Sequence, residues 1–237
     1  MEEPLFVIIG SGSDIAQELI SLIMSDGYQV LSCDRREVKT PRTLVGDISN
    51  PDFVREFFDK AVLESTDIRL AIIAGTTFPC RGVYPLELWE ETFKINATGT
   101  FLILREFHAR IVKDEISSGS IVTISSAIAD KSLENNPAYP ASKLAIESLT
   151  RHYALTFGSK SISVNCVAPG YIKSGMTKGS WRVRRKRLAR SELSFFKRWG
   201  EPKEVATLIY HLLSNKRSFI SGATYYIDGG WRANSGL

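Results

Sequence analysis

Cysteine is scarce in this sequence of 237 residues. Its three cysteines, Cys33, Cys80 and Cys166, are odd in number and far apart. Disulfide frameworks need paired cysteines and zinc sites need closely spaced ones, so neither is indicated. We expect all three to be small buried hydrophobic residues. The three histidines show no metal-ligand spacing, and no metal site is predicted.

Long hydrophobic runs are also lacking. No stretch approaches the roughly 18 apolar residues that a membrane-spanning helix requires. The apolar run at 5–9 is too short for the core of a signal peptide, and no basic residue precedes it. No internal repeat or low-complexity tract stands out. We therefore expect a cytoplasmic protein that does not contact a membrane.

Positive charge is concentrated in one segment. The formal net charge is only +4, yet nine Lys or Arg residues stand against one acid between Lys178 and Arg198. The rest of the chain is therefore net acidic, and the protein is a mildly acidic domain with one basic segment.

Short apolar runs alternate with helical patterns along the chain. The runs are LFVIIG, YQVLSCD, RTLVGDIS, RLAIIAG, GSIVTISS, SISVNCVAPG and ATYYID. Most are continuous rather than alternating, which is typical of parallel strands covered on both faces. We predict an α/β fold for residues 1–237, namely a single Rossmann-like, doubly wound parallel sheet of about seven strands with helices on both faces.

The alternation lapses at about 176–199, which includes the basic segment. An insertion of this length is more often a functional loop or lid than scaffold.

A glycine-containing loop, GSGSDIAQELI, follows the first predicted strand. Backbone N–H groups of such a loop, with the start of the next helix, suit a pyrophosphate. The pattern G-x-G-x-x-G does not fit, but a wider spacing of Gly10, Asp14 and Ala16 does. We expect Asp14 to cap the helix, with Gln17 as the return partner, and its side chain to point away from the pyrophosphate.

Asp34 ends the second predicted strand, where an acid hydrogen-bonds the adenosine ribose in dinucleotide sites. A carboxylate there repels a 2′-phosphate and favours NAD. Arg35 and Arg36 follow directly and partly offset this charge, which leaves NADP possible.

Further motifs occur in a fixed order. They are GDIS at 46–49, Ala74–Gly75, INATGTF around Asn96, TISS ending at Ser126, YPASK from Tyr139 to Lys143, VAPGYIKS at 167–174, GEPKEVA at 200–206 and SGATYYIDGG at 221–230. With them the sequence resembles the short-chain dehydrogenase/reductase family over nearly its whole length, including its 3-oxoacyl-[acyl-carrier-protein] reductases and its sugar and polyol dehydrogenases.

The resemblance implies an NAD(P)-dependent oxidoreductase that interconverts a secondary alcohol and a ketone by hydride transfer. Tyr139 would be the acid or base, Lys143 its activator, Ser126 the group that binds the substrate oxygen, and Asn96 the holder of a proton-relay water. Free tyrosine has a pKa of about 10, so it needs a nearby positive charge to exchange protons at neutral pH. A lysine four residues further on lies on the same helical face.

The resemblance also implies cofactor contacts and a homo-oligomer, either a tetramer or a dimer. The expected cofactor-binding residues are Gly10, Ser11, Ser13, Asp14, Ile15, Asp34, Arg35, Asp47, Ile48, Ala74, Gly75, Tyr139, Lys143, Pro169, Gly170, Ile172 and Ser174.

In the family the segment after Pro169 and Gly170 covers the substrate. We hypothesise that Arg182, Arg184 and Arg185 bind an anionic small molecule, such as a carboxylate, a phosphorylated or nucleotide-linked sugar, or a carrier-bound acyl group. A solvated basic helix or a subunit contact would explain the same charges. Alternatives from other classes are a cofactor sensor without turnover and a nucleic-acid-binding protein. The intact set of four expected catalytic residues argues against both, so no nucleic-acid partner is predicted.

Overall fold

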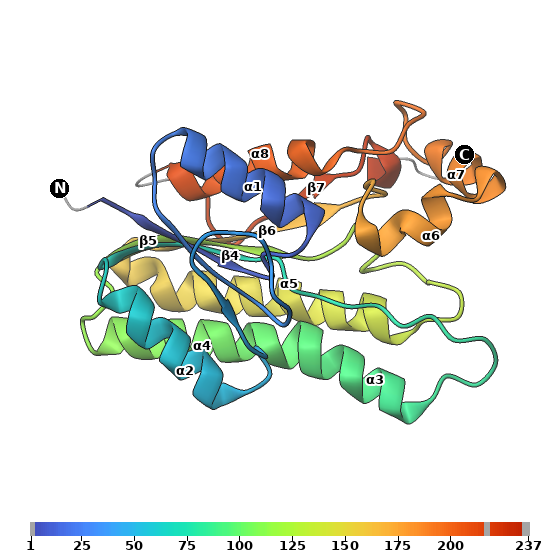
Figure 1. Cartoon of the computed structure of the whole chain (residues 1–237). Helices are drawn as coiled ribbons and strands as arrows, with labels where there is room; N and C mark the ends of the chain where they lie inside the picture. Colours follow the sequence, from blue (N-terminus) through green and yellow to red (C-terminus); the bar gives the residue numbers. More distant parts are fainter. Residues whose placement is uncertain (1–2, 216–218, 234–237) are drawn as a thin grey trace.

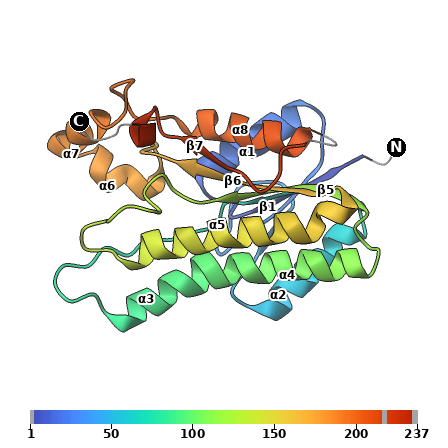
Figure 2. The same ribbon diagram turned by 180° about the vertical axis from the view of Figure 1, so that it is seen from behind.

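A computed structural model describes residues 3–215 and 219–233 of the chain (Figures 1 and 2). Its centre is one sheet in the order β3-β2-β1-β4-β5-β6-β7, with every neighbouring pair parallel. The strands are β1 (Leu5–Ile9), β2 (Val30–Asp34), β3 (Thr43–Val45), β4 (Asp67–Ile72), β5 (Ser118–Ile124), β6 (Ser163–Pro169) and β7 (Thr224–Ile227). The predicted fold class and strand number are confirmed.

Helices cover both faces of this sheet, with α1 and α8 on one face and α2, α4 and α5 on the other (Figures 1 and 2). The α-helices are α1 (Asp14–Ser25), α2 (Pro51–Val62), α3 (Leu86–Phe93), α4 (Gly99–Val112), α5 (Ala138–Phe157), α6 (Lys178–Trp181), α7 (Arg184–Ser191) and α8 (Pro202–Ser214). Shorter turns are the π-helix η1 (Lys94–Thr98) and the 3₁₀ turns η2 (Gly158–Lys160), η3 (Gly175–Thr177) and η4 (Trp231–Ala233). In the described residues, none of the helices has the length and apolar character needed to span a bilayer.

The two faces of the sheet bury separate hydrophobic clusters. Phe57, Phe58 and Phe107 lie in the cluster under α2, α4 and α5, and each is fully buried. Phe6 and Leu19 belong to the cluster under α1 and α8. Burying a side chain of this size stabilises the fold by roughly 1.5–3 kcal/mol. The continuous apolar strands follow from this two-sided burial.

The strand order reverses direction at β1 and β4, which is where open α/β sheets bind ligands. The N–H groups of Ile73 and Ala74 both donate to the carbonyl of Ile9, so the two strand ends are held together. Gly10 follows with φ +86°, and a Cβ on it would lie 2.6 Å from the Ala74 nitrogen. Only glycine fits there without strain.

The start of α1 differs from the expectation. Ser13 is the N-cap residue, and its hydroxyl accepts from the N–H of Ala16 at 3.2 Å. The Gln17 amide donates to the Ser11 carbonyl and to a threonine hydroxyl instead of returning to a cap. The expected Asp14–Gln17 capping pair was therefore wrong, because Asp14 is already the first helical residue.

The insertion at 176–199, which we call the lid, is helical and lies beyond one end of the sheet (Figure 1). Trp199 is buried, and its indole N–H donates to the Arg187 carbonyl at 3.0 Å. The Trp181 ring packs edge-on against Trp199, with 5.3 Å between the ring centres. The guanidinium carbon of Arg187 lies 5.1 Å from the centre of the Trp181 ring. The lid thus has a small aromatic core of its own.

The cysteines follow the expectation only in part. Cys33 and Cys166 are buried, and burial raises the pKa of their thiols to about 12 and about 11. Cys80 is partly exposed, because it lies in the irregular segment between β4 and α3.

Candidate active site

The four expected catalytic residues come together near the carboxyl ends of the central strands. Ser126 follows β5, Tyr139 and Lys143 lie in the first turns of α5, and Asn96 comes from η1. The Ser126 side chain lies close enough to Tyr139 to lower the pKa of its phenol. Sequence positions that are far apart therefore meet at one edge of the sheet, as parallel topology requires.

Tyr139 is a protonated phenol at neutral pH. Burial raises its pKa above the ordinary value, and the nearby Ser126 side chain acts in the opposite direction. The nearby phenol of Tyr171 adds to the rise. In the ligand-free chain Tyr139 is therefore set up as a proton donor, and a proton acceptor there needs added positive charge.

Lys143 supplies that charge from a buried position. Its Nζ donates to the Ile124 carbonyl at 3.0 Å and lies 5.8 Å from the centre of the Tyr139 ring. Burial disfavours the ammonium and lowers the pKa of Lys143 to about 8. A charge held in such surroundings acts on the adjacent phenol more strongly than one in water does.

Asn96 is fixed through its whole side-chain amide. Its Oδ1 accepts from the Thr76 N–H at 2.7 Å, and its Nδ2 donates to the Thr76 carbonyl at 3.0 Å and to the Ser142 hydroxyl at 2.9 Å. The π-turn η1 interrupts what is otherwise one continuous helix from α3 to α4, a feature common at functional sites. The proton-relay role of Asn96 stays a prediction.

The loop after β1 has the form of a dinucleotide cradle. Asp34 accepts from the Gly12 N–H at 2.9 Å and from the Arg36 N–H at 3.1 Å, so its carboxylate is anchored beside the loop. The side chains of Arg35 and Arg36 are exposed. A Cβ on Gly75 would lie 3.1 Å from Lys143 Nζ, so the absence of a side chain keeps this approach open. These residues fit a nicotinamide dinucleotide.

The other expected cofactor residues differ in exposure and position. Ile48 and Ile172 are buried, so they offer a ligand little beyond their backbone. Asp47 is exposed after β3, and its Oδ1 accepts from the Ser49 N–H at 2.8 Å. The hydroxyl-bearing and small residues of this set lie at the strand ends or caps and comprise Ser11, Ser13, Ala74, Pro169, Gly170 and Ser174.

Asp14 contacts the first turn of the lid. Its Oδ2 accepts from the Gly175 N–H at 2.6 Å, although the two residues are 161 positions apart. Asp14 therefore joins the cofactor loop to η3. The contact was not readable from the sequence, because it depends on where the lid begins in space.

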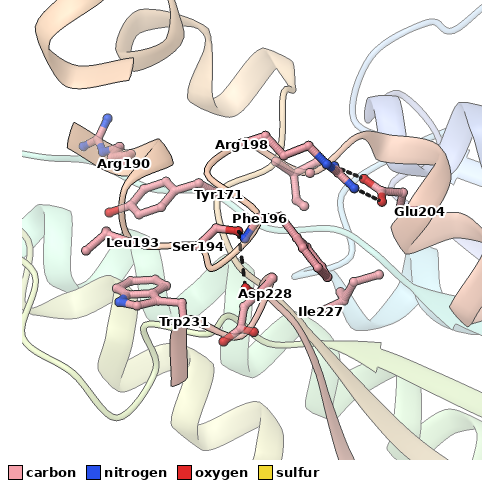
Figure 3. A pocket seen from close by; sticks show the side chains of 13 residues that line it. Tyr171, Arg190, Leu193, Ser194, Phe196, Arg198, Glu204, Ile227, Asp228 and Trp231 are labelled. Atoms are coloured by element: carbon pink, nitrogen blue, oxygen red, sulfur yellow. Dashed lines mark hydrogen bonds and ion pairs between the residues drawn. The ribbon is translucent and has the colours of Figure 1, made fainter. Parts of the chain in front are cut away.

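The lid arginines occupy different surroundings from those expected. Arg182, Arg184 and Arg185 are exposed and line no part of the cavity under the lid, which has a volume of about 80 Å³ (Figure 3). Arg190 lines this cavity instead, together with Tyr171. The residues that the sequence reading missed are Gly12, Tyr171, Gly175, Arg190 and Trp231.

Comparison with known proteins agrees with this geometry. The family model described as enoyl-(acyl carrier protein) reductase matches residues 15–232. Cis-4-hydroxycyclohexanecarboxylate dehydrogenase of Sinomonas cyclohexanicum is 31% identical over 96% of this chain and 86% of its own length. L-xylulose reductase of Caenorhabditis elegans is 31% identical over 96% of this chain and 95% of its own. The chain belongs to the short-chain dehydrogenase/reductase family.

As a member of this family the protein is an NAD(P)-dependent oxidoreductase that acts on alcohols and ketones. Among solved structures, ElxO with NADP bound superposes with a TM-score of 0.88 at 23% identity, covering 99% of this chain and 100% of that one. At this identity the likeness supports the fold. Substrate and cofactor preference have to be argued from the chain's own residues.

Proposed function

We propose that this short-chain dehydrogenase/reductase interconverts a small secondary alcohol and its ketone, preferring NAD, with Tyr139 as the acid and base. The observation that carries this proposal is the placement of Ser126 beside the Tyr139 phenol, with the buried Lys143 four residues further along α5. A carbonyl oxygen needs a hydroxyl to orient it and a phenol to protonate it, and a nearby ammonium assists the phenol.

The chain's own groups have separate tasks in this mechanism. Ser126 donates a hydrogen bond to the substrate oxygen and orients it toward Tyr139. Tyr139 gives its proton to that oxygen during reduction and takes it back during oxidation. Lys143 stabilises the phenolate and, with Asn96, connects that proton to solvent. The nicotinamide, when bound, supplies or accepts the hydride.

Holding the dinucleotide falls to the loop after β1. The N–H groups at the start of α1, at Asp14 and Ile15, would hold the pyrophosphate, because a helix N-terminus attracts anions. Gly10 and Gly75 allow the close backbone approach.

NAD is preferred in this proposal because of Asp34. Its carboxylate is fixed by the Gly12 N–H at the end of β2, where it would accept from ribose hydroxyls of a bound dinucleotide and repel a 2′-phosphate. The exposed Arg35 and Arg36 are free to turn toward a phosphate, so removing Asp34 should improve NADPH binding.

The test is a fluorescence titration of purified protein with NADH and NADPH. Wild type is expected to bind NADH at least ten-fold more tightly, and Asp34→Ala to narrow or reverse that ratio. Asp52→Ala removes an exposed carboxylate at the start of α2, outside the expected cofactor contacts, and should leave the ratio unchanged. Equal or tighter NADPH binding by wild type would contradict the NAD preference and leave the oxidoreductase chemistry intact.

Asp14 is expected to weaken cofactor binding, since it places a negative charge in the first turn of the helix that meets the pyrophosphate. Asp14→Gly should lower the dissociation constant for NADH by about 3–10-fold, the equivalent of a partly screened charge repulsion of about 1 kcal/mol. Asp52→Gly removes the matching first-turn acid of α2 and is the control. An unchanged or higher constant in Asp14→Gly would refute this expectation.

The substrate is proposed to be a small hydroxylated molecule with an anionic group. The relative named for cis-4-hydroxycyclohexanecarboxylate acts on a ring alcohol that carries a carboxylate. That compound is accordingly the first substrate to assay, with NAD and at neutral pH.

Nucleic acid is not proposed as a partner. The Trp181 ring, which would have to stack on a base, already has Lys173 at 4.7 Å and Arg187 at 5.1 Å from its centre. Its surface is therefore engaged by the lid's own cations.

A cytoplasmic homo-oligomer, a dimer or a tetramer, is part of the proposal. Leu144 and Leu155 on α5 and Phe101 and Val112 on α4 are exposed, and apolar exposure of this kind is typical of association surfaces. Light scattering coupled to size-exclusion chromatography tests it, and a monomer at micromolar concentration would rule it out.

A further inference from the structure

One arginine of the lid has a buried nitrogen without a partner. Arg190, on α7, lines the cavity under the lid. Its Nη1 atom is shielded from solvent and makes no hydrogen bond within residues 3–215 and 219–233. An unpaired buried donor costs about 1–3 kcal/mol and more when it is charged. A buried group of this kind is completed by a water, an ion or a ligand.

The other charged side chains around this cavity already have partners. Arg198 forms a two-pronged pair with Glu204, with nitrogen–oxygen distances of 2.8 and 2.7 Å (Figure 3). Asp228 is also in the lining, and its carboxylate accepts from the N–H groups of Gly230 and Arg232 at 2.9 and 2.8 Å. Among the lining residues described, Arg190 is thus the charge with donor capacity to spare.

Arg190 is held in a stack that borders the reacting groups. Its Cζ lies 4.9 Å from the centre of the Tyr171 ring, and that ring stacks on Trp231 at 5.3 Å with an angle of 26°. Figure 3 shows the three side chains along one side of the cavity. Tyr171 is close enough to Tyr139 to raise the pKa of its phenol. The guanidinium is therefore fixed in orientation near the expected position of the substrate.

The size of the cavity limits what it accepts. About 80 Å³ holds several water molecules, each of which needs roughly 10–15 Å³ by the same measure. A carboxylate or a phosphoryl group fits this space, and a whole sugar ring or acyl chain does not.

We propose that Arg190 is a specificity-determining residue that binds a small oxyanion, a carboxylate or a phosphoryl group, at the end of the substrate remote from the reacting carbon. The guanidinium offers two parallel N–H groups to such a group, and Tyr171 keeps its plane in place. This assignment rests on the proposed function, since it names the substrate class of that same site. It replaces the exposed Arg182, Arg184 and Arg185 as the anion-binding part of the lid.

The experiment titrates the full chain with three probes and follows tryptophan fluorescence, to which Trp231 in the stack contributes. The probes are cyclohexanecarboxylate, cyclohexyl phosphate and the neutral cyclohexanecarboxamide. Wild type should bind at least one of the two anions saturably and the amide at least ten-fold more weakly. The first two probes distinguish a carboxylate site from a phosphoryl site.

Variants distinguish anion binding by Arg190 itself from attraction by the overall positive charge of the lid. Arg190→Met should weaken anion binding at least ten-fold, and Arg190→Lys should retain an intermediate affinity because it keeps the charge without the planar fork. Arg184→Met removes the same charge from an exposed position on the same helix and should bind the anion like wild type. Thermal midpoints and NADH affinity verify that each variant is folded.

Three results overturn the inference: wild type binds neither anion, the amide binds as tightly as the acid, or Arg184→Met loses as much affinity as Arg190→Met. Turnover of cis-4-hydroxycyclohexanecarboxylate and of its neutral carboxamide separates this failure from that of the proposed function. Equal kcat/KM values for the acid and the carboxamide would refute the role of Arg190 in anion binding and leave the proposed function intact. Anion binding that depends on Arg190, without turnover of any alcohol by wild type, would refute the proposed function and leave the anion site intact.

Discussion

Replacing Tyr139 with phenylalanine is expected to lower kcat by about 10²–10⁴-fold in both directions, which is the usual size of general acid–base catalysis. The substitution removes one oxygen from a site where Ser126 remains to orient the substrate. Cofactor affinity should stay within about two-fold, because the ring and Lys143 are kept. The loss would therefore fall on kcat and leave NADH binding unchanged.

Steady-state assays with a secondary alcohol that wild type oxidises, together with NADH titration, measure the two quantities. Tyr210→Phe is the matched control, since it deletes a phenol oxygen on α8 that hydrogen-bonds Asp26, near the amino end of β1 and away from the catalytic residues. It should lose some stability and no activity. Retention of more than a tenth of wild-type kcat by Tyr139→Phe would show that another group moves the proton.

Replacing Lys143 with methionine is expected to abolish most activity and to make the protein more stable at pH 7. Burial lowers the pKa of Lys143 from 10.5 to about 8. At about 1.36 kcal/mol for each pKa unit, the charged ammonium destabilises the folded state by about 3 kcal/mol at neutral pH. Loss of the hydrogen bond to the Ile124 carbonyl offsets about 1 kcal/mol of the gain.

The pH dependence follows from the direction of this shift. Below about pH 8 the lysine is charged in both states, so the folded protein carries the whole destabilisation. Between about 8 and 10.5 the unfolded chain binds the proton and the folded chain does not, so the contribution of Lys143 to stability rises with pH. The advantage of the methionine variant should therefore shrink across that range.

Urea unfolding of both proteins from pH 7 to 10.5 measures this difference. Lys160→Met removes an exposed lysine whose pairing with Asp114 is a surface ion pair, and its effect should stay below about 1 kcal/mol at every pH. A methionine variant at position 143 that is less stable than wild type at pH 7 would mean that the lysine is stabilised by its surroundings and that its charge is not costly.

The fold was predictable because its signals are local. Each strand is a continuous apolar run, and two-sided burial leaves no other use for such runs in a chain of this composition. Helical spacing places Tyr139 and Lys143 on one face, and their roles as a pair came from the resemblance to the family. Their meeting with Ser126 followed from the rule that parallel strands end at one edge of the sheet.

Two details could not be predicted from the sequence, namely the N-cap residue of α1 and the inward face of α7. Ser13 and Asp14 are both good N-cap residues, and the choice between them depends on the turn that Gly10 sets after β1. In α7 most positions are basic, so no periodicity marks the inward face. The packing of Trp199 and Trp181 turns Arg190 inward and leaves Arg184 in solvent.

The hydrogen bond between Asp14 and Gly175 has a thermodynamic consequence. It joins the helix that follows the cofactor loop to the first turn of the lid, so a ligand that displaces either segment changes the free energy of the other. By linkage, the factor by which the dinucleotide alters substrate affinity equals the factor by which the substrate alters dinucleotide affinity. The Asp14 carboxylate thereby provides a direct connection through which the two binding equilibria are coupled.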